Sequence, residues 1–385
     1  MAAEAFETRA AAGSLPDVSP ARARAVVLER FGAPLVVREF DVPRAGPGEM
    51  VVASRFGGIC GTDLHLHRGH LPIPLPLVLG HEGLGVVREL GPGAELDAMG
   101  SPLRVGDEVM WASSISCGAC VPCRIHREPT LCVNRRTYGV NRPITEGSGL
   151  NGAWADAIHL RAGTTVVKVP PGIDHLAAMA LACAGPTMVH ALFERRPVRL
   201  GEVVVVQGSG PVGLAAAALA KLAGAARVVV AGGPAARLAQ AAAARIGDDH
   251  IDVLGGAGLD DVAALGADLV IECTGVPAAV GQGLRLPRRG GSYLVVGQYT
   301  DAGDVPINPH QIVLRQLDVV GSWAFTGAHL VEYVRLLPAL TADFDLASLA
   351  TTFPLNGVGA AFEALASGSV MKAVLAAGRG GSGPR

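Results

Sequence analysis

The hydrophobic and polar positions of the chain follow one pattern before about Arg161 and another from Val198 onward. In the first region, short runs such as RAVVLERF, EMVVAS, GLGVVREL and GDEVMWAS are separated by glycine and proline. Short apolar runs at this spacing are typical of the strands of a sandwich or barrel. The region from Arg24 to about Arg161 is therefore predicted to be a mostly β, barrel-like unit.

The region from Val198 to Val320 alternates apolar runs with helix-like segments, as in EVVVVQ, PVGLAAAALAKLA, RVVVA, AARLAQAAAARIG, ADLVIEC, GSYLVVG and LDVVGS. Continuous apolar strands that alternate with helices predict a parallel sheet covered on both faces. An alanine-rich helical stretch precedes this region, and two helix-like segments follow it. The predicted fold class is α/β, a doubly wound parallel sheet joined to a mostly β domain.

The size and charge of the chain narrow the function classes. A chain of 385 residues exceeds the usual limit of one hydrophobic core, so two domains are expected. A formal net charge of −2 gives no electrostatic reason to expect a nucleic acid or a membrane as partner. The longest apolar runs are interrupted by lysine, arginine and glycine before they could span a bilayer. These features favour a compact globular protein.

The termini and the cysteines suggest a compartment. Residues 1–23 mix acids with arginines and have no apolar core, so they are expected to form a flexible leader and not a secretory signal. Residues 378–385, rich in glycine, are expected to form a flexible tail. Seven cysteines without an export signal indicate a reducing compartment, the cytoplasm, where clustered thiols are more often metal ligands than disulfides.

The segment VVVVQGSGPVGLAAAALAK carries a glycine motif between a predicted strand and a predicted helix. Gly208 permits a tight turn, Gly210 lets the backbone approach a pyrophosphate, and Gly213 allows close packing of helix on strand. Pro211 suits the first helical position, and with Val212 it opens a helix whose free N–H groups bind phosphate. A glycine triplet alone would also fit an ordinary turn, but its place within several strand–helix units predicts dinucleotide binding.

The segment SCGACVPCRIHREPTLC contains four closely spaced cysteines, Cys117, Cys120, Cys123 and Cys132. Two C-x-x-C steps with a fourth cysteine further along can place four thiolates around one tetrahedral zinc. Iron–sulfur ligation uses similar spacing and is the main alternative metal. Because all four ligands come from one loop and leave no open position, the site is predicted to be structural.

Three further candidate ligands lie outside that loop. They are Cys60 in GGICGTDLHLHRGH, His81 in PLVLGHEGLGVV and Cys183 in MALACAGPTMVH. Each one alone is also compatible with a buried cysteine or a hydrogen-bonded core histidine. Together with the glycine motif and the four-cysteine loop, they resemble the zinc-dependent alcohol dehydrogenases of the medium-chain dehydrogenase/reductase superfamily. The resemblance extends from about Arg24 to about Ala377.

The resemblance implies a fold and two zinc ions per chain. It implies a Rossmann NAD(P)-binding domain at 188–324 and a GroES-like catalytic domain formed by 24–187 and 325–377. Cys60, His81 and Cys183 match the catalytic zinc ligands, which leave one position open, and the four-cysteine loop matches the structural zinc site. Asp63 and Glu82 match positions around the metal, where carboxylates tune it. The loop has eight residues before its fourth cysteine where the family usually has seven, so a bulge near Glu128-Pro129 or weaker zinc binding is expected.

The same resemblance implies a proton relay. Thr62 matches the residue that links the substrate oxygen to the relay, and His65 matches the outer histidine. No family role carries over to His67 and His70, which are expected in a solvated loop. The implied reaction removes a proton and a hydride from an alcohol, or adds them to a carbonyl compound.

The choice of cofactor depends on the end of the second strand of the predicted sheet. NAD-preferring relatives have an acidic residue there that binds the ribose hydroxyls, and this chain has Gly232. Without that carboxylate, nothing holds the ribose and nothing repels a 2′-phosphate. Arg237 could approach the phosphate, although an arginine here is also frequent in NAD-using relatives. Thr274 is also assigned to the cofactor site, and the sequence leans slightly toward NADP or use of both cofactors.

The sequence defines the substrate less closely than it defines the cofactor site. The pocket candidates are Ser113, Tyr138, Trp154, Trp323 and Phe325, and their aromatic character favours a secondary or cyclic alcohol. Polyol and threonine-type dehydrogenases of the same superfamily are alternatives, and a homodimer or homotetramer is implied. The zinc-free quinone and enoyl reductases share the fold but lack the metal ligands found here. A non-catalytic redox sensor on this fold is a further alternative, against which the intact relay argues.

Overall fold

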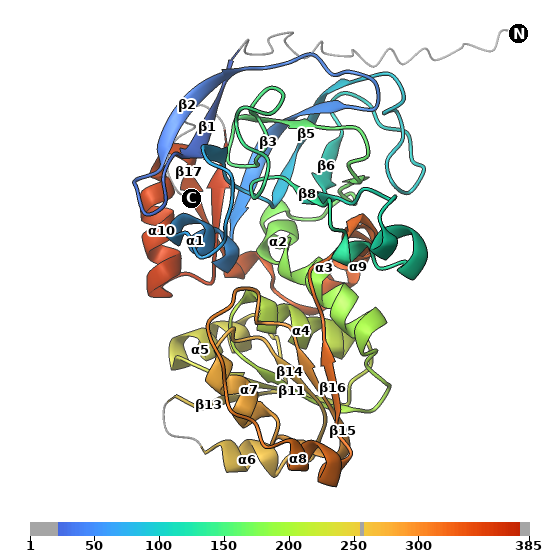
Figure 1. Cartoon of the computed structure of the whole chain (residues 1–385), viewed down its shortest axis with the longest axis vertical. Coiled ribbons are helices and arrows are strands. Elements are labelled where there is room, and N and C mark those ends of the chain that lie inside the picture. The colour runs from blue at the N-terminus through green and yellow to red at the C-terminus, as the bar shows by residue number, and fades with distance from the viewer. Residues whose placement is uncertain (1–21, 255–257, 378–385) are drawn as a thin grey trace, which may run out of the picture.

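The structure is a computed structural model that describes residues 22–254 and 258–377. It consists of two domains stacked along the long axis of the molecule (Figure 1). The expected leader lies almost entirely outside the described residues, and the expected tail lies wholly outside them. None of the helices in the described part of the chain is long and apolar enough to cross a membrane.

The lower domain in Figure 1 is built on a parallel sheet. Within the described residues it has six strands in the order β13-β12-β11-β14-β15-β16, which is the doubly wound order. The strands are β11 (Val203–Gln207), β12 (Arg227–Gly232), β13 (Asp249–Asp252), β14 (Ala267–Glu272), β15 (Pro287–Val295) and β16 (Asp318–Gly321). The helices are α4 (Pro211–Leu222), α5 (Ala235–Ala243), α6 (Leu259–Ala263), α7 (Pro277–Gly283) and α8 (Pro309–Arg315). The central valines of β11 are fully buried, as expected for a sheet covered on both faces.

The upper domain is mostly β. Its larger sheet is centred on β3 (Met50–Ile59), which pairs with β5 (Gly83–Leu90), β9 (Ala157–Leu160) and β18 (Lys372–Ala376). The same sheet contains β6 (Glu108–Trp111), β10 (Val166–Lys168) and β17 (Ala350–Pro354). Smaller sheets are formed by β1 (Arg22–Leu28), β2 (Val36–Asp41) and β4 (Leu77–Val78), and by β7 (Ser114–Ile115) and β8 (Arg136–Thr137). The C-terminal strands β17 and β18 thus return to the domain that begins the chain.

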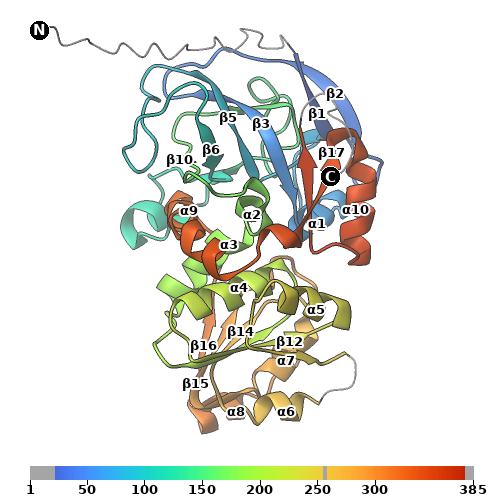
Figure 2. The ribbon, with the colours of Figure 1, turned by 180° about the vertical axis from the view of Figure 1, so that it is seen from behind.

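Helices connect and cover the domains. They are α1 (Gly61–Arg68), α2 (His175–Ala180), α3 (Ala184–Val189), α9 (Gly327–Asp343) and α10 (Val358–Ser367). The backbone after α3 continues as a π-helix at His190–Arg195, and a second π-helix spans Pro122–His126. Short 3₁₀ turns lie at Pro129–Leu131, Ala347–Leu349 and Leu355–Gly357. α3 packs against both α4 and α9, so one hydrophobic core continues through the junction of the domains (Figure 2).

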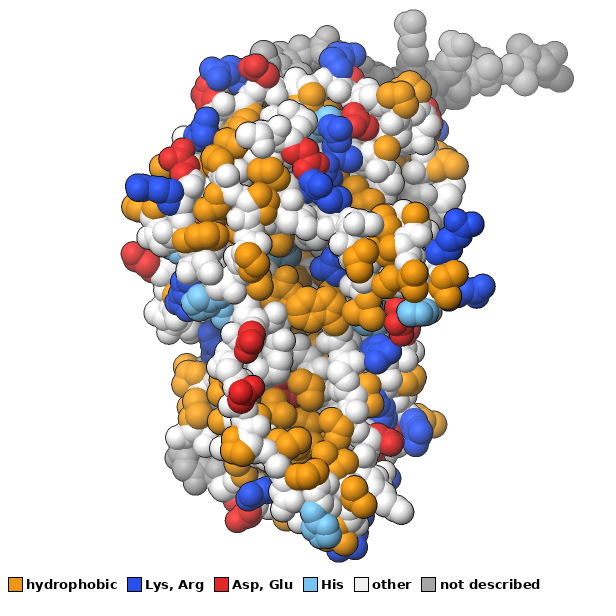
Figure 3. All heavy atoms as spheres, in the orientation of Figure 1, with side chains coloured by type: hydrophobic (Ala, Val, Ile, Leu, Met, Phe, Trp, Pro, Cys, Tyr) orange, Lys and Arg blue, Asp and Glu red, His pale blue; other side chains and the backbone are white. Residues whose placement is uncertain are grey.

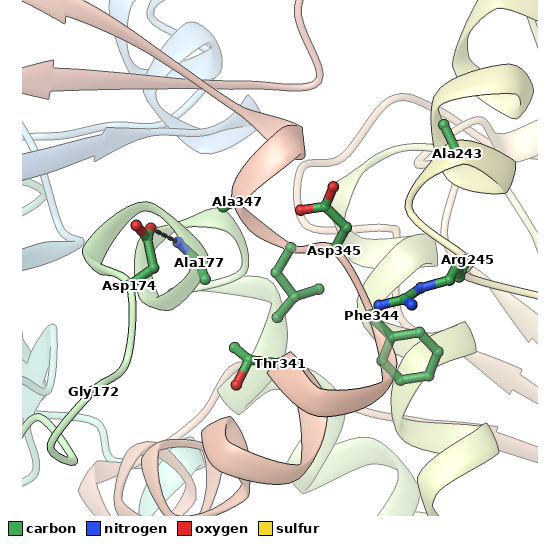
Figure 4. Close-up of a pocket in the computed structure, with 10 residues that line it drawn as sticks. Gly172, Asp174, Ala177, Ala243, Arg245, Thr341, Phe344, Asp345 and Ala347 are labelled. Atoms are coloured by element: carbon green, nitrogen blue, oxygen red, sulfur yellow. Dashed lines mark hydrogen bonds between the residues drawn. The ribbon is translucent and has the colours of Figure 1, made fainter.

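The predicted α/β architecture is confirmed. We propose the domain limits expected from the sequence, 24–187 with 325–377 and 188–324, because the parallel sheet begins and ends inside the second range. The junction also contains a cavity of about 610 Å³. Its lining residues are Gly172, Asp174, Ala177, Ala243, Arg245, Thr341, Phe344, Asp345, Leu346 and Ala347 (Figure 4). None of these lining residues belongs to the cysteine and histidine motifs, so the candidate site is elsewhere.

Candidate active site and metal centres

Cys60 lies where β3 ends and α1 begins. Its Sγ accepts a hydrogen bond from the backbone N–H of Thr62 at 3.3 Å, and its own N–H donates to Asp63 Oδ2 at 2.9 Å. This reciprocal capping fixes the first turn of the helix, with the sulfur at the end where the helix dipole favours negative charge. The local sequence C-G-T-D therefore holds a thiol in a position that stabilises a thiolate.

The structure brings the three predicted catalytic ligands together. One ligand atom each of Cys60, His81, Glu82 and Cys183 lies within 4.8 Å of the others. Cys60 Sγ is 3.3 Å from His81 Nε2, close to the spacing of about 3.6 Å that sulfur and nitrogen have around tetrahedral zinc. His81 Nδ1 faces Asp63 Oδ1 at 3.3 Å, the contact by which a carboxylate orients a ligating imidazole. The donor set and its geometry fit zinc.

The charges and hydrogen bonds around Cys60 also favour its thiolate form. The hydrogen bond with Cys183, together with the charges of His81 and Lys372, holds the pKa of the Cys60 thiol well below its ordinary value despite burial. A thiolate is the form that binds metal. The Cys60 sulfur is therefore suited to a divalent ion.

A buried ion pair lies beneath this cluster. Lys372 Nζ donates to Glu82 Oε2 at 2.5 Å, and both side chains are almost completely buried. Burial raises the pKa of Glu82, which the charge of Lys372 opposes. Glu82 Oε1 has no hydrogen-bond partner among the described residues and lies 3.8 Å from His81 Nε2. No local pattern indicated Lys372 as the partner of Glu82, because the pair joins residues 290 positions apart.

The four-cysteine loop forms a second cluster. One sulfur each of Cys117, Cys120, Cys123 and Cys132 lies within 4.8 Å of the others. The sulfurs of Cys120 and Cys132 are 3.9 Å apart, against about 3.8 Å for two thiolates on tetrahedral zinc. Backbone N–H groups of Ala119 and Cys120 lower the pKa of Cys117 to about 6. The four sulfurs thus fit a structural metal, and together they would occupy all four of its coordination positions.

The loop has an irregular backbone next to Glu128-Pro129, where a bulge was expected. The π-helix at Pro122–His126 ends at Arg127, whose φ of 59° lies in the left-handed region. The 3₁₀ turn that follows then returns the chain to Cys132. This irregular turn still leaves the four sulfurs close together.

A third group of ligand-type side chains consists of His190, Glu194 and His329. The N–H of Thr326 donates to His329 Nδ1 at 2.9 Å, so this nitrogen uses its lone pair as an acceptor. The other nitrogen, Nε2, then carries the proton and lies 2.9 Å from Glu194 Oε1. His329 has no free lone pair for a metal in this arrangement. His190 stacks on the His329 ring, and its Nδ1 lies 2.9 Å from the carbonyl oxygen of Ala324.

The expected relay residues Thr62 and His65 are half-buried on α1. The hydroxyl of Thr62 makes no hydrogen bond to any described residue, and its backbone N–H is the one that binds the Cys60 sulfur. His65 Nδ1 lies 3.0 Å from His70 Nδ1, and the two rings pack with centroids 5.2 Å apart. His67 instead bonds the carbonyl oxygen of Ala33 at 2.8 Å. The expectation of a simply solvated loop for His67 and His70 therefore misses a partner for each.

The glycine motif lies between β11 and α4. Gly208 has a φ of 122°, a conformation that residues with a Cβ rarely adopt. A Cβ on Gly213 would collide with the carbonyl oxygen of Gly208, so close helix–strand packing requires glycine. Gly210 is the N-cap of α4 and Pro211 its first residue, ahead of Val212. This arrangement is one in which the N–H groups of a helix N-terminus can bind a pyrophosphate.

The end of β12 is held against the glycine motif. Ser209 Oγ donates to the carbonyl oxygen of Gly233 at 2.9 Å, and a Cβ on Gly232 would be 2.9 Å from the backbone nitrogen of Ser209. Gly232 thus has no room for the acidic residue found in NAD-preferring relatives. A carboxylate is nevertheless near, because Asp252 on β13 pairs in register with Gly232 and its Oδ1 would be 3.0 Å from a Cβ on Gly233. The expectation from the sequence concerned the end of β12 only and did not include this residue of β13.

Of two other expected cofactor residues, Thr274 has hydrogen-bond partners in the protein, whereas the Nε atom of Arg237 is buried without one among the described residues. Arg237 Nη2 is 3.2 Å from where a Cβ on Gly368 would lie, at the end of α10 in the other domain. The Thr274 hydroxyl donates to Glu272 Oε1 at 2.6 Å. Glu272, fully buried, also accepts bonds from the N–H groups of Thr274, Gly275 and Gly297. Sequence reasoning missed Glu272, which joins two loops at the carboxyl ends of β14 and β15.

The substrate-pocket candidates divide into two groups. Tyr138 and Trp154 are fully buried, and their polar atoms bond Thr164 Oγ1 and the carbonyl oxygen of Gly58. These two aromatics belong to the hydrophobic core and were wrongly expected in the pocket. Ser113 and Phe325 are also buried, whereas Trp323 is 41% exposed.

Trp323 packs against Tyr299, a residue that the sequence analysis did not suggest. Its ring stacks on Tyr299, with centroids 5.0 Å apart and planes 7° apart. Burial raises the pKa of the Tyr299 hydroxyl, and the charges of His81 and Arg135 oppose this. Tyr299 therefore lies within electrostatic reach of the cluster at Cys60 and His81. Figure 3 shows hydrophobic side chains along a recess at mid-height of the molecule.

Two family models match this chain. The alcohol dehydrogenase GroES-like domain matches residues 46–171, and the zinc-binding dehydrogenase model matches residues 211–340. The 5-exo-hydroxycamphor dehydrogenase of Pseudomonas putida is 29% identical over 88% of this chain and 95% of its own length. The alcohol dehydrogenase of Geobacillus stearothermophilus is 30% identical over 90% of this chain and 97% of its own.

Relatives at similar identity are named for other alcohols. The sorbitol dehydrogenase of Halalkalibacterium halodurans is 30% identical over 74% of this chain and 79% of its own length. The L-threonine 3-dehydrogenase of Deinococcus deserti is 30% identical over 87% of this chain and 93% of its own. Identity at this level therefore does not separate substrates.

Solved structures show the same fold. An alcohol dehydrogenase from Thermotoga maritima superposes with a TM-score of 0.86 and 34% identity, over 92% of this chain and 99% of that one. A protein of Sinorhizobium meliloti 1021, described as a zinc-binding dehydrogenase and bound to NADP, gives a TM-score of 0.80 and 27% identity over the same shares.

Proposed function

Since this chain belongs to the zinc-containing alcohol dehydrogenases of the medium-chain dehydrogenase/reductase superfamily, we propose that it oxidises a secondary or cyclic alcohol to a ketone, or catalyses the reverse, with zinc and NAD or NADP. The observation that carries the proposal is the cluster of Cys60, His81 and Cys183 in a chain that also has the dinucleotide motif. The motif lies on the Rossmann sheet and the cluster at the base of the β domain.

Each bound group would supply one part of the chemistry. Zinc, held by Cys60, His81 and Cys183, supplies a Lewis acid that stabilises negative charge on the alcohol oxygen. The nicotinamide supplies the hydride acceptor. The protein's own part is to orient the substrate carbon, to exclude water and to carry the hydroxyl proton away.

The proton path begins at Thr62 and continues through His65. The contact of His65 with His70 extends it, because the two facing Nδ1 atoms can share only one proton. His70 is exposed, so a proton that leaves His65 Nδ1 reaches solvent through His70. Burial lowers the pKa of His65, and the charges of His70 and Arg68 lower it further. A low pKa keeps His65 able to accept a proton as the pH falls.

We expect His70→Gln to move the acidic limb of the pH profile for alcohol oxidation to higher pH. Oxidation requires unprotonated His65, so the rate falls as the pH drops through its pKa, and removing the charge of His70 lets that pKa rise. The measurement is kcat against pH, with His67→Gln as the control because His67 bonds Ala33 and not His65. An unchanged profile in His70→Gln would remove it from the relay.

The reaction itself is tested with a panel of alcohols and spectrophotometric detection of the reduced nicotinamide. Secondary and cyclic alcohols should be oxidised faster than primary ones. The second candidate is a polyol or threonine-type dehydrogenase, which the named activities of the sorbitol and threonine relatives favour. The same panel with sorbitol, arabinitol and threonine decides between them, and reduction of quinones without metal would contradict both.

For the cofactor, we propose NADP or dual use, supported by the absence of an acid at Gly232 and by the NADP-bound relative structure. We expect kcat/KM with NADP to be at least comparable to that with NAD. Asp252→Asn should increase the preference for NADP, because it removes the carboxylate beside Gly233. Asp249→Asn is the matched control, since Asp249 pairs with Arg227 at the other end of β13. A hundredfold preference of the unmodified enzyme for NAD, about 2.7 kcal/mol, would contradict the proposal.

We also propose a cytoplasmic homodimer or homotetramer without nucleic-acid or membrane partners. The supports are the balanced charge and the oligomers that the family forms. Analytical ultracentrifugation of the purified protein tests the oligomeric state.

A further inference from the structure

The order of the strands assigns the two halves of a dinucleotide to opposite sides of β11. In a Rossmann sheet the pyrophosphate lies at the glycine motif after the first strand, and the end of the second strand holds the adenosine ribose. Here these strands are β11 and β12, and the neighbour of β11 on its other side is β14, followed by β15. The nicotinamide half therefore belongs at the carboxyl ends of β14 and β15.

The turns that follow β14 and β15 pack directly against the glycine motif and each other. A Cβ on Gly208 would be 3.1 Å from the carbonyl oxygen of Cys273, and a Cβ on Gly297 would be 2.6 Å from the backbone nitrogen of Gly275. The three turns thus meet through their backbones. Thr274, on the turn after β14, is exposed. The turns therefore continue the surface of the phosphate site toward the end of β15.

Glu272, the last residue of β14, binds both of these turns. Its side chain is fully buried. Its Oε1 accepts hydrogen bonds from the N–H and the hydroxyl of Thr274, both at 2.6 Å, and from the N–H of Gly275 at 3.0 Å. Its Oε2 accepts a hydrogen bond from the N–H of Gly297 at 3.1 Å. One carboxylate therefore joins the turn after β14 to the turn after β15.

These side-chain bonds are not needed to pair the two strands. β14 and β15 already pair in register up to Glu272 with Val295, and the N–H groups of Val296 and Gly297 lie 3.1 and 3.0 Å from the carbonyl oxygen of Glu272. Among the described residues the carboxylate is met by N–H and O–H donors and not by a cation. Burying a carboxylate in this way is costly. Its presence therefore indicates a task beyond the strand ends.

From this arrangement we infer that Glu272 is a positioning residue for the cofactor, which holds the turns after β14 and β15 in the conformation that receives the nicotinamide half. The inference rests on the proposed use of NAD or NADP and adds a residue to it. Turns that are already ordered do not have to be ordered on binding, so they save affinity that flexible turns would lose. The competing role of Glu272 is one in folding alone.

The test is Glu272→Gln, which keeps the shape of the side chain and puts an NH₂ group in place of one oxygen. In either orientation of the amide this NH₂ faces a backbone N–H, so at least one turn is released. Isothermal titration calorimetry compares NADH or NADPH, whichever binds the unmodified protein more tightly, with ADP-ribose or 2′-phospho-ADP-ribose, the same molecule without nicotinamide. Glu272→Gln should bind the whole cofactor about tenfold more weakly and this fragment within about twofold of the unmodified protein.

Asp268→Asn is the matched control, because it is the same change of acid to amide near the opposite end of β14. Asp268 also joins neighbouring segments, since it accepts hydrogen bonds from the N–H of Val203 at 2.8 Å and from Arg288 Nε at 2.7 Å. These segments lie at the amino end of the strand, away from the proposed nicotinamide site. Asp268→Asn should therefore leave both affinities within about twofold of those of the unmodified protein.

Thr274→Val is the second variant, which decides if Glu272→Gln does not fold. It removes the hydroxyl that donates to Glu272 and leaves the three backbone donors in place. Because fewer bonds are lost, it should weaken binding of the whole cofactor by only about threefold and leave binding of the fragment unchanged.

Three outcomes overturn the inference and leave the proposed function standing. The first is an equal loss of affinity for cofactor and fragment in Glu272→Gln. The second is a lower melting temperature with both affinities unchanged, which would give Glu272 a role in folding alone. The third is an unmodified protein that binds fragment and cofactor equally tightly, because its turns would then not hold the nicotinamide half. If the unmodified protein bound neither molecule, the proposed function itself would be contradicted.

Discussion

Replacing Cys60 with alanine is expected to remove one of two zinc equivalents and to lower kcat by more than about a thousandfold, since a Lewis acid contributes several kcal/mol to the barrier. The fold should survive, because Cys60 caps one short helix and its neighbours are held by their own core contacts. The measurements are elemental analysis of the purified variant and single-turnover kinetics. Retention of both equivalents, or of activity, would show that Cys60 is not a ligand of the catalytic ion.

Two other cysteines make this test specific. Cys273 lies outside both clusters and is buried beside β14, so Cys273→Ala should retain both zinc equivalents and most of the activity. Cys120→Ala should also remove one equivalent, but its main effect should be a lower melting temperature, because metal binding in a structural loop contributes to folding. Iron in place of zinc, or a single equivalent in the unmodified protein, would contradict the two-site assignment.

The parallel sheet could be predicted because its strands are buried on both faces and read as continuous apolar runs, as in the valines of β11. The four-cysteine cluster could be predicted because its residues lie in one short motif, and the Cys60–His81–Cys183 cluster because its three segments resemble those of a known family. The turn at Cys60 illustrates this, since the capping of α1 by Cys60 and Asp63 is a local consequence of C-G-T-D. Local patterns predict well wherever the structure is determined by neighbours in sequence.

Contacts between distant segments could not be predicted in this way. The partner of Glu82 is on the last strand, and the carboxylate nearest Gly233 comes from the adjacent strand β13. The error at Tyr138 and Trp154 has a related cause, because aromatic character does not distinguish a core position from a pocket wall. Tyr299 was missed because a lone tyrosine in a loop has no motif.

Thr62→Ala is the second large effect that we expect. The loss of its hydroxyl interrupts the proton path at its first step, so alcohol oxidation should slow by about a hundred- to ten-thousandfold. Binding of the nicotinamide cofactor, measured by fluorescence, should change little, because Thr62 lies on α1 and the cofactor motif lies on the other domain. Zinc content should also be unchanged, since the contact of Thr62 with the Cys60 sulfur is made by its backbone N–H.

Thr62→Ser is the matched control for this prediction. It keeps the hydroxyl and removes one methyl group, so it should retain most of the activity and the pH profile of the unmodified enzyme. If Thr62→Ala were as active as Thr62→Ser, the hydroxyl would have no part in proton transfer. His65 and His70 would then have to receive the proton by another route. The effect of His70→Gln on the acidic limb of the pH profile would decide whether that route includes them. This limb reports the pKa of His65, whichever group delivers the proton to it.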